Sequence, residues 1–433
     1  MVGVRYIVFA VLSLIILASL ETFNLAFSGI SAADAVRQGA DLRPQIAAIS
    51  LWALLVFLSF IPGVARLPVR IKGLQWPAML LGWIVLSSLW SDDPMGALPK
   101  AAVLLACSLA AWRTTSIVTV EEMFACIYYN IAMLLVASLA LAIFMPTIGV
   151  MQDEWQHVGN WQGIFASKQG LGMVSAVFLG ISLLRVAGRR TVFDVAMCGV
   201  GLACLLGSSS RGAGVMTFVA VACLVVARKY PRLTLAVTGV FALDMILAVL
   251  NISYFAATGD ASIQIFGYDI NFTERTFIWQ YALGLWTDRP LIGYGLNGFW
   301  TNSNLYYSYF RLHGWVLDNY HSGYLAIIVE TGVVGFGLFL AVSYQVISKL
   351  YYLLRNSGAN RLNLETTLAF LLMFFTINLT ETYFLRSTNF LSILFTFLIV
   401  KILSTPELYP RGLPARSRRI GRRPFRVGPT ATV

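Results

Sequence analysis

The side chains best suited to chemistry in this sequence are a histidine and a few cations between long apolar segments. His321 is one of only three histidines, with His157 and His313. Its ordinary pKa of about 6.5 suits a general base at neutral pH, although a single histidine beside an apolar segment is more often a hydrogen-bonded structural residue. Glu330 follows inside an apolar segment, where a carboxylate marks either function or a specific partner.

Two arginines lie in short polar motifs. Arg211 belongs to SSSRG at 208–212, where it is either a side chain that reaches the membrane surface or an anion ligand. The neighbouring hydroxyls, including that of Ser210, and the following glycine favour the anion ligand. Arg275 belongs to ERT at 274–276, where it either pairs with a nearby carboxylate or holds phosphate.

A third cation, Lys168, lies in the glycine-rich segment GIFASKQGLG at 163–172. This segment is either an ordinary re-entry into the bilayer or a place where the lysine binds phosphate. One cation among glycines is a loose pattern, so both interpretations stay open.

The long polar stretch at 251–321 is rich in aromatic residues. Its tryptophans are Trp279, Trp286, Trp300 and Trp315. Such rings either form an interfacial belt or stack on sugar rings. Arg289 precedes PLIGYGLNGF at 290–299, in which one proline and three glycines predict tight turns.

Cysteine and histidine form no pattern that predicts a metal site. The five cysteines lie inside apolar segments without C-x-x-C spacing, and the histidines are scattered. Thiolate and imidazole metal sites need clustered ligands. We therefore expect no disulfide framework, no metal and no other cofactor.

The composition indicates what positions these residues. Hydrophobic residues make up 58% of the 433 residues and charged residues only 12%, against about 45–50% and about 25% in an average soluble domain. So few charges could hardly cover a soluble surface, and so apolar a chain is not disordered. The sequence predicts an all-α polytopic membrane protein.

Twelve segments approach the roughly 20 apolar residues that a spanning helix needs. They are 4–20, 46–64, 76–91, 98–118, 123–145, 170–187, 192–207, 213–228, 233–250, 322–348, 364–380 and 387–403. The first resembles a signal peptide, but the similar segments after it favour an uncleaved span. We expect one transmembrane domain over 1–410, in which the loop 251–321 carries short helices, and a basic tail at 411–433.

Basic residues predict the orientation, because they concentrate in cytoplasmic loops. If the spans alternate from a cytoplasmic N-terminus, 22 of the 31 Lys and Arg residues fall on the cytoplasmic side. Both termini are then cytoplasmic, and the motifs with Arg211, Arg275 and His321 lie on the outer side. The Pro- and Gly-broken tail predicts contact with membrane lipids and no binding of nucleic acid.

Taken together, these motifs resemble the O-antigen ligase and Wzy-type polysaccharide polymerase superfamily. The resemblance rests on SSSRG (208–212), ERTxxW (274–279), PLIGYG (290–295) and H-S-x9-G-x-x-G (321–335), and it covers about 160–345. The segment 163–172 looks like that of the ExoQ-like exopolysaccharide polymerases. The chain departs from the pattern at Gln169 and at Ser322, where asparagine is commoner.

The resemblance implies a membrane glycosyltransferase on the periplasmic side of a bacterial inner membrane. Its substrates would be an undecaprenyl-diphosphate-linked oligosaccharide and the growing polysaccharide chain, with chain-length regulators and export proteins as candidate partners. Arg211 and Arg275 would hold the diphosphate and His321 would act as the base, because guanidiniums bind phosphate oxygens and imidazole accepts a proton. The implied substrate-binding residues are Lys168, Ser210, Trp279, Arg289 and Glu330.

Three alternatives stay open. An O-antigen ligase would transfer glycan to lipid A core, and the segment 163–172 favours a polymerase over it. A flippase would show repeats and a site in the middle of the membrane, whereas no repeat is evident and the polar motifs gather on one face. A scaffold of an export complex would leave the one-sided set of arginines and histidine unexplained.

Overall fold

The structure is a computed structural model that describes residues 2–19, parts of 50–58, 73–299 and 319–404. Inside these ranges, the segments 116, 153–157, 166, 190, 230–261, 266–267, 272, 357–360, 380 and 387–388 are not described. The predicted span 233–250, most of 46–64, the tail 411–433, His157 and His313 therefore lie outside the described residues.

The other ten predicted spans coincide with helices. They are α1 (Val2–Ser19), α6 (Gln75–Ser87), α7 (Pro94–Thr114), α8 (Val120–Phe144), α10 (Lys168–Arg189), α11 (Val192–Ser208), α12 (Arg211–Lys229), α16 (Gly323–Asn356), α17 (Arg361–Ile377) and α18 (Phe390–Ser404). Two short helices, α9 (Pro146–Gly149) and α14 (Thr273–Trp286), lie between them.

Four described helices are long and apolar enough to cross a membrane by length and composition: α7, α8, α10 and α16. The apolar parts of α1, α6, α11, α17 and α18 are shorter, at 10–17 residues. The chain thus has several candidate spans, and the total of twelve stays a prediction.

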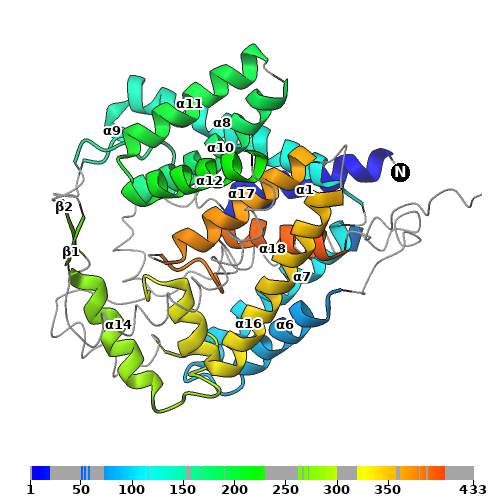
Figure 1. The fold of residues 1–433 in the computed structure, drawn as a ribbon, viewed down its shortest axis with the longest axis vertical. Helices are drawn as coiled ribbons and strands as arrows, with labels where there is room; N and C mark the ends of the chain where they lie inside the picture. Colours follow the sequence, from blue (N-terminus) through cyan, green and yellow to red (C-terminus); the bar gives the residue numbers. More distant parts are fainter. Residues whose placement is uncertain are drawn as a thin grey trace, which may run out of the picture.

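The helices form two groups that meet at α17. The helices α8, α9, α10, α11 and α12 lie together on one side, and α6, α7 and α16 lie on the other (Figure 1). Helix α17 packs against α10 and α12 of the first group and against α16 and α18. Because α17 contacts both groups, the turn at its carboxyl end lies between them.

Aromatic packing holds this junction. Phe370 and Phe374 of α17 are at most 2% exposed, and Phe374 stacks on Phe395 of α18 with ring centroids 4.3 Å apart. Phe384 contacts Phe374 edge to face at 5.1 Å and Phe339 of α16 at 4.7 Å. Such aromatic contacts add specific geometry to apolar burial, so they fix where α17 ends relative to α16.

Helix α16 is broken at Gly332, which has φ of 69° and ψ of −175°. A Cβ there would lie 2.1 Å from the carbonyl oxygen of Leu291. The N–H of Val333 donates instead to the carbonyl of Pro290 at 2.9 Å, so the turn from Pro290 inserts at the break. Gly332 interrupts the helix, because residues with a side chain rarely adopt this conformation.

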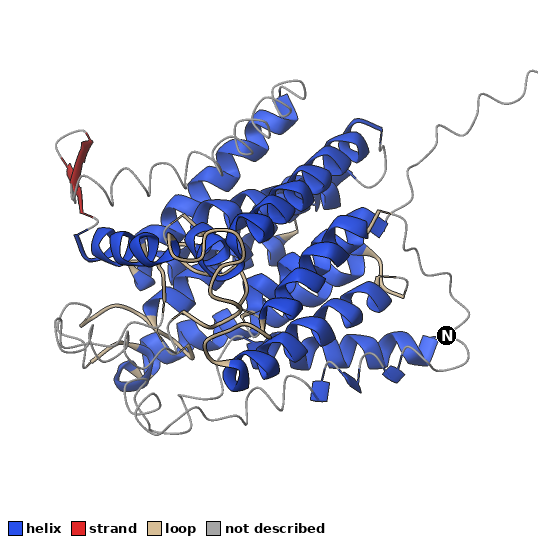
Figure 2. Cartoon of the chain, turned by 90° about the horizontal axis from the view of Figure 1, so that it is seen from below, coloured by secondary structure: helices blue, strands red, loops and turns tan. Residues whose placement is uncertain are grey.

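The long loop departs from the all-α prediction. Strands β1 (Ser262–Ile265) and β2 (Tyr268–Asn271) pair antiparallel, with Ile263 opposite Ile270. The predicted short helices are represented by α14, which follows the hairpin directly. Figures 1 and 2 both show the hairpin and the N-terminus at opposite ends of the molecule.

Candidate active site

Each predicted cation of the motifs lies at the start of a helix. Lys168 begins α10, Arg211 begins α12, and Arg275 lies in the first turn of α14. His321 lies two residues before Gly323, where α16 begins. The amino end of a helix carries partial positive charge, so it favours an anion and disfavours a cation. Three cations and a histidine at such ends therefore indicate a site for an anionic group.

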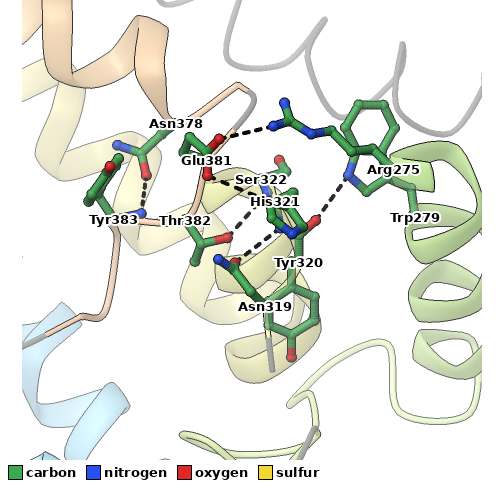
Figure 3. A network of polar contacts seen from close by, with 10 residues as sticks. All are labelled: Arg275, Trp279, Asn319, Tyr320, His321, Ser322, Asn378, Glu381, Thr382 and Tyr383. Carbon is green, nitrogen blue, oxygen red and sulfur yellow. Dashed lines mark hydrogen bonds and ion pairs between the residues drawn. The ribbon is translucent and has the colours of Figure 1, made fainter. Parts of the chain in front are cut away.

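Glu381 joins two of these side chains (Figure 3). Its Oε1 accepts a hydrogen bond from Nη2 of Arg275 at 3.0 Å, and its Oε2 lies 3.5 Å from Nδ1 of His321. The second distance suits an ion pair but is long for a hydrogen bond, and Nδ1 has no hydrogen-bond partner in the described part of the chain. The three side chains are 25–32% exposed, so a ligand can reach them.

The backbone of His321 is held in an unusual conformation. Its φ is 48°, in the left-handed region that is unfavourable for residues with a Cβ. The N–H of His321 donates to Oδ1 of Asn319 at 3.1 Å, and the N–H of Ser322 donates to Oγ1 of Thr382 at 3.2 Å. Strain that the surroundings hold in place is common at functional sites, and here it aims the imidazole at Glu381.

Ser322 is the cap of α16, since its Oγ accepts a hydrogen bond from the N–H of Leu325 at 3.4 Å. Serine and asparagine are similarly good helix caps. The departure from the family pattern at this position therefore preserves the local structure beside His321.

Asn378 shapes the turn that carries Glu381. Its Oδ1 accepts hydrogen bonds from the N–H groups of Tyr383 at 2.9 Å and Phe384 at 3.0 Å. Its carbonyl accepts one from Gly323 at 2.8 Å. A Cβ on Gly323 would lie 2.0 Å from Oδ1 of Asn378, so a glycine permits this approach. The start of α16 and the end of α17 are thereby fixed to each other.

Trp279 supports the backbone beside His321. Its Nε1 donates to the carbonyl of Tyr320 at 3.0 Å, and its side chain is 3% exposed. The indole therefore packs in the protein, while a contact of Trp279 with substrate stays a prediction. Tyr320 is also fully buried, and burial, followed by the nearby charge of Glu330, raises the pKa of its phenol well above the ordinary value.

Two of the predicted motifs meet where α10 packs against α12. A Cβ on Gly172 would lie 2.5 Å from Cβ of Ser210 and 2.9 Å from Oγ of Ser208. Lys168 lies one turn before Gly172, on the same face of α10. Arg211 is exposed, and its side chain has no hydrogen bond or ion pair among the described residues. The two cations thus flank the Ser208–Ser210 corner.

Gly212 places this corner beside the turn of Glu381. A Cβ on Gly212 would lie 3.6 Å from Cδ1 of Ile377, the last residue of α17. The carbonyl of Ile377 accepts a hydrogen bond from the N–H of Glu381 at 2.9 Å. The structure therefore gathers the helix starts of Arg211, Arg275 and His321 around one turn, while their catalytic roles stay predictions.

Arg289 and Glu330 instead contact the segment 290–297, which inserts at the break in α16. Nη1 of Arg289 lies 2.8 Å from Oδ1 of Asp92, and its guanidinium covers the ring of Tyr294 at 4.8 Å. Glu330 is 8% exposed and accepts a hydrogen bond from the N–H of Asn297 at 3.0 Å. Both side chains have partners within the protein, and their contact with substrate stays a prediction.

Sequence reasoning overlooked Glu381. It lies in the short segment between the predicted spans 364–380 and 387–403, which contains none of the motifs. The signal that could have found it is topological. This segment falls on the same predicted face as His321, and it contains one acidic residue with Arg386 as its one basic residue.

Residues 195–340 match the family described as O-antigen ligase. The predicted resemblance is confirmed. The O-antigen ligase match includes the positions of Arg211, Arg275 and His321, whereas Lys168 and Glu381 lie outside it. The matched residues make up about a third of the chain.

The chain is also similar to the exopolysaccharide production protein ExoQ of Rhizobium meliloti (strain 1021). The two are 24% identical over 261 residues, which are 57% of this chain and 58% of that protein. The match therefore spans less than two thirds of the relative. It agrees with the ExoQ-like branch expected from the sequence.

Proposed function

We propose that this protein polymerises lipid-diphosphate-linked oligosaccharide repeat units into exopolysaccharide at the periplasmic face of the bacterial inner membrane. Arg211 and Arg275 bind the diphosphate of the donor, and His321 accepts the proton of the acceptor hydroxyl. Lys168 adds positive charge at the start of α10. The observation that carries the proposal is the single carboxylate of Glu381, which contacts both Arg275 and His321.

In the proposed reaction, the acceptor oxygen forms a bond to the anomeric carbon of the donor sugar. The bond between that carbon and the diphosphate oxygen breaks, and its electron pair leaves with the diphosphate. The hydroxyl proton passes to Nε2 of His321. Fixed guanidiniums stabilise the charge that develops on the leaving group, so the chemistry of these residues calls for no nucleotide sugar and no metal.

Glu381 has two roles in this proposal. When Nδ1 of His321 carries a proton directed at Glu381, Nε2 is unprotonated and can act as the base. The carboxylate stabilises the imidazolium that forms, as an orienting acid does beside a catalytic histidine. It also restrains Arg275, so the diphosphate and the base are held at a fixed separation, and such positioning lowers the barrier of a two-substrate reaction.

The acceptor distinguishes the polymerase from its nearest alternative. A polymerase joins one repeat unit to another, whereas an O-antigen ligase transfers glycan to lipid A core. The similarity to an exopolysaccharide production protein supports the polymerase. An unrelated alternative is a lipid-linked oligosaccharide flippase, which would have no need of a base beside an arginine.

The size profile of surface polysaccharide from a deletion strain tests this proposal. Loss of long chains with retention of single repeat units is the expected result. Loss of all glycan from lipid A core would indicate the ligase instead. Lipid-linked units trapped on the inner leaflet would indicate a flippase and contradict the enzyme.

A further inference from the structure

An apolar cavity of about 530 Å³ lies between α6, α7, α16, α17 and α18. Its volume is within the range of about 300–1,000 Å³ that is usual for small-molecule sites. The segment from Tyr383 to Arg386 forms part of its wall. Among the described residues that line the cavity, Arg386 is the only charged one. The cavity is thus lined by apolar side chains, with the guanidinium of Arg386 as its one described charge.

The cavity is long in the direction of the helices. It follows α7 from Leu104 to Trp112 and α18 from Ser392 to Val400. At 1.5 Å per residue, each stretch is about 12 Å long. One leaflet of the hydrocarbon core is about 15 Å thick. The depth therefore suits an extended apolar chain that occupies one leaflet.

The cationic end of the cavity adjoins the turn of Glu381. Tyr383 follows Glu381 by two residues, so their Cα atoms are at most about 7 Å apart, and Arg386 follows by five, at most about 18 Å. Arg386 also lies within electrostatic range of Glu330. An anionic group at this end would therefore lie between Arg386 and the side chains around Glu381.

We propose that this cavity holds the isoprene units of the donor lipid nearest its diphosphate, with the diphosphate between Arg386 and the cations around Glu381. This inference rests on the proposed function. In the donor, the diphosphate links the reacting sugar directly to the polyprenyl chain, so that chain must begin beside His321. In the acceptor, the reacting hydroxyl is separated from its own lipid by a repeat unit, and a bystander phospholipid has no link to the reaction.

Filling the cavity provides the test. Ser108 of α7 lines the cavity and is half-buried, whereas Ala102 of the same helix is exposed and does not line it. We expect Ser108→Trp to raise the KM for the natural long-chain donor by about tenfold or more, equivalent to about two buried methylenes lost. The matched control Ala102→Trp should leave KM unchanged. Equal KM values for the two variants would overturn the inference.

A donor with a single five-carbon isoprene unit separates this inference from the proposed function. Such a chain fills less than half of the cavity's length, so the wild type should use it poorly, and Ser108→Trp should not impair its use further. Equal use of short and long donors by the wild type would overturn the cavity as the chain site while the proposed function stands. No transfer from either donor would contradict the proposed function.

Photolabelling tests the site without reference to activity. A photoactivatable polyprenyl diphosphate should label residues of α6, α7 or α18 that line the cavity in the full-length protein. Undecaprenyl diphosphate should displace this label, and phosphatidylglycerol at the same concentration should not. Labelling elsewhere, or equal displacement by the phospholipid, would overturn the inference. Ala78→Phe on α6, which fills the cavity from another helix, should reduce labelling even if Ser108→Trp fails to fold.

Discussion

Arg275 and His321 contact the two oxygens of one carboxylate, although 45 positions separate them in the sequence. Nη2 of Arg275 is 3.0 Å from Oε1 of Glu381, and Nδ1 of His321 is 3.5 Å from Oε2. Arg275, which we propose binds the diphosphate, and His321, the proposed base, are therefore separated by no more than one carboxylate and its two contacts. This distance is well within the reach of a sugar diphosphate.

The first prediction concerns Glu381. Glu381→Gln keeps the size of the side chain but removes the charge that would stabilise protonated His321. We expect kcat to fall by about 100-fold, the scale of a general-base contribution, with a smaller change in KM. Kinetics with lipid-linked repeat units would measure both constants. Glu121→Gln at the start of α8 is the control, and an unchanged kcat in Glu381→Gln would remove Glu381 from the mechanism.

The second prediction concerns Arg275. Arg275→Lys keeps the charge but loses the planar guanidinium that binds a phosphate and a carboxylate at once. We expect polymerisation to fall by at least about tenfold, which is about 1.4 kcal/mol of transition-state binding. The chain-length distribution of the product would report the loss. Arg113→Lys in the last turn of α7 is the matched control. Full activity of Arg275→Lys would show that a positive charge alone is sufficient at this position.

The third prediction separates catalysis from strain at His321. His321→Ala and His321→Gly should both abolish long-chain product while leaving membrane insertion intact. Glycine adopts φ of 48° without the steric penalty of a Cβ, so His321→Gly should be more stable than His321→Ala by about 1 kcal/mol. Thermal unfolding of the two purified variants would compare them. Equal stability of the two variants would contradict backbone strain at residue 321. Polysaccharide of normal chain length would exclude His321 as the base.

The fourth prediction concerns the break in α16. Gly332→Ala places a Cβ 2.1 Å from the carbonyl of Leu291, at a φ and ψ that suit only glycine. We expect a loss of about 2–5 kcal/mol in stability from strain and overpacking together. Gly337→Ala is the control, since its Cβ would meet no atom within 4 Å in the described structure. Similar thermal unfolding of both variants would show that the break tolerates a side chain.

The apolar segments and the distribution of charge were sufficient to predict most of the helices. Ten predicted spans coincide with helices because a long apolar segment in a membrane must satisfy its own backbone hydrogen bonds. The same reasoning placed the motifs of Arg211, Arg275 and His321 on one face. It did not predict the β1–β2 hairpin, because short strands in a polar loop carry a weak pattern.

The sequence by itself determined the class of protein and most of the helices. Only the tertiary structure decided that Glu381 joins Arg275 to His321, that Trp279 is buried and that Gly332 breaks α16. The physical reason is that local patterns report burial and helix formation, which depend on neighbours in sequence. A contact between α14, the start of α16 and the end of α17 depends instead on how distant helices pack, and no local pattern encodes that packing.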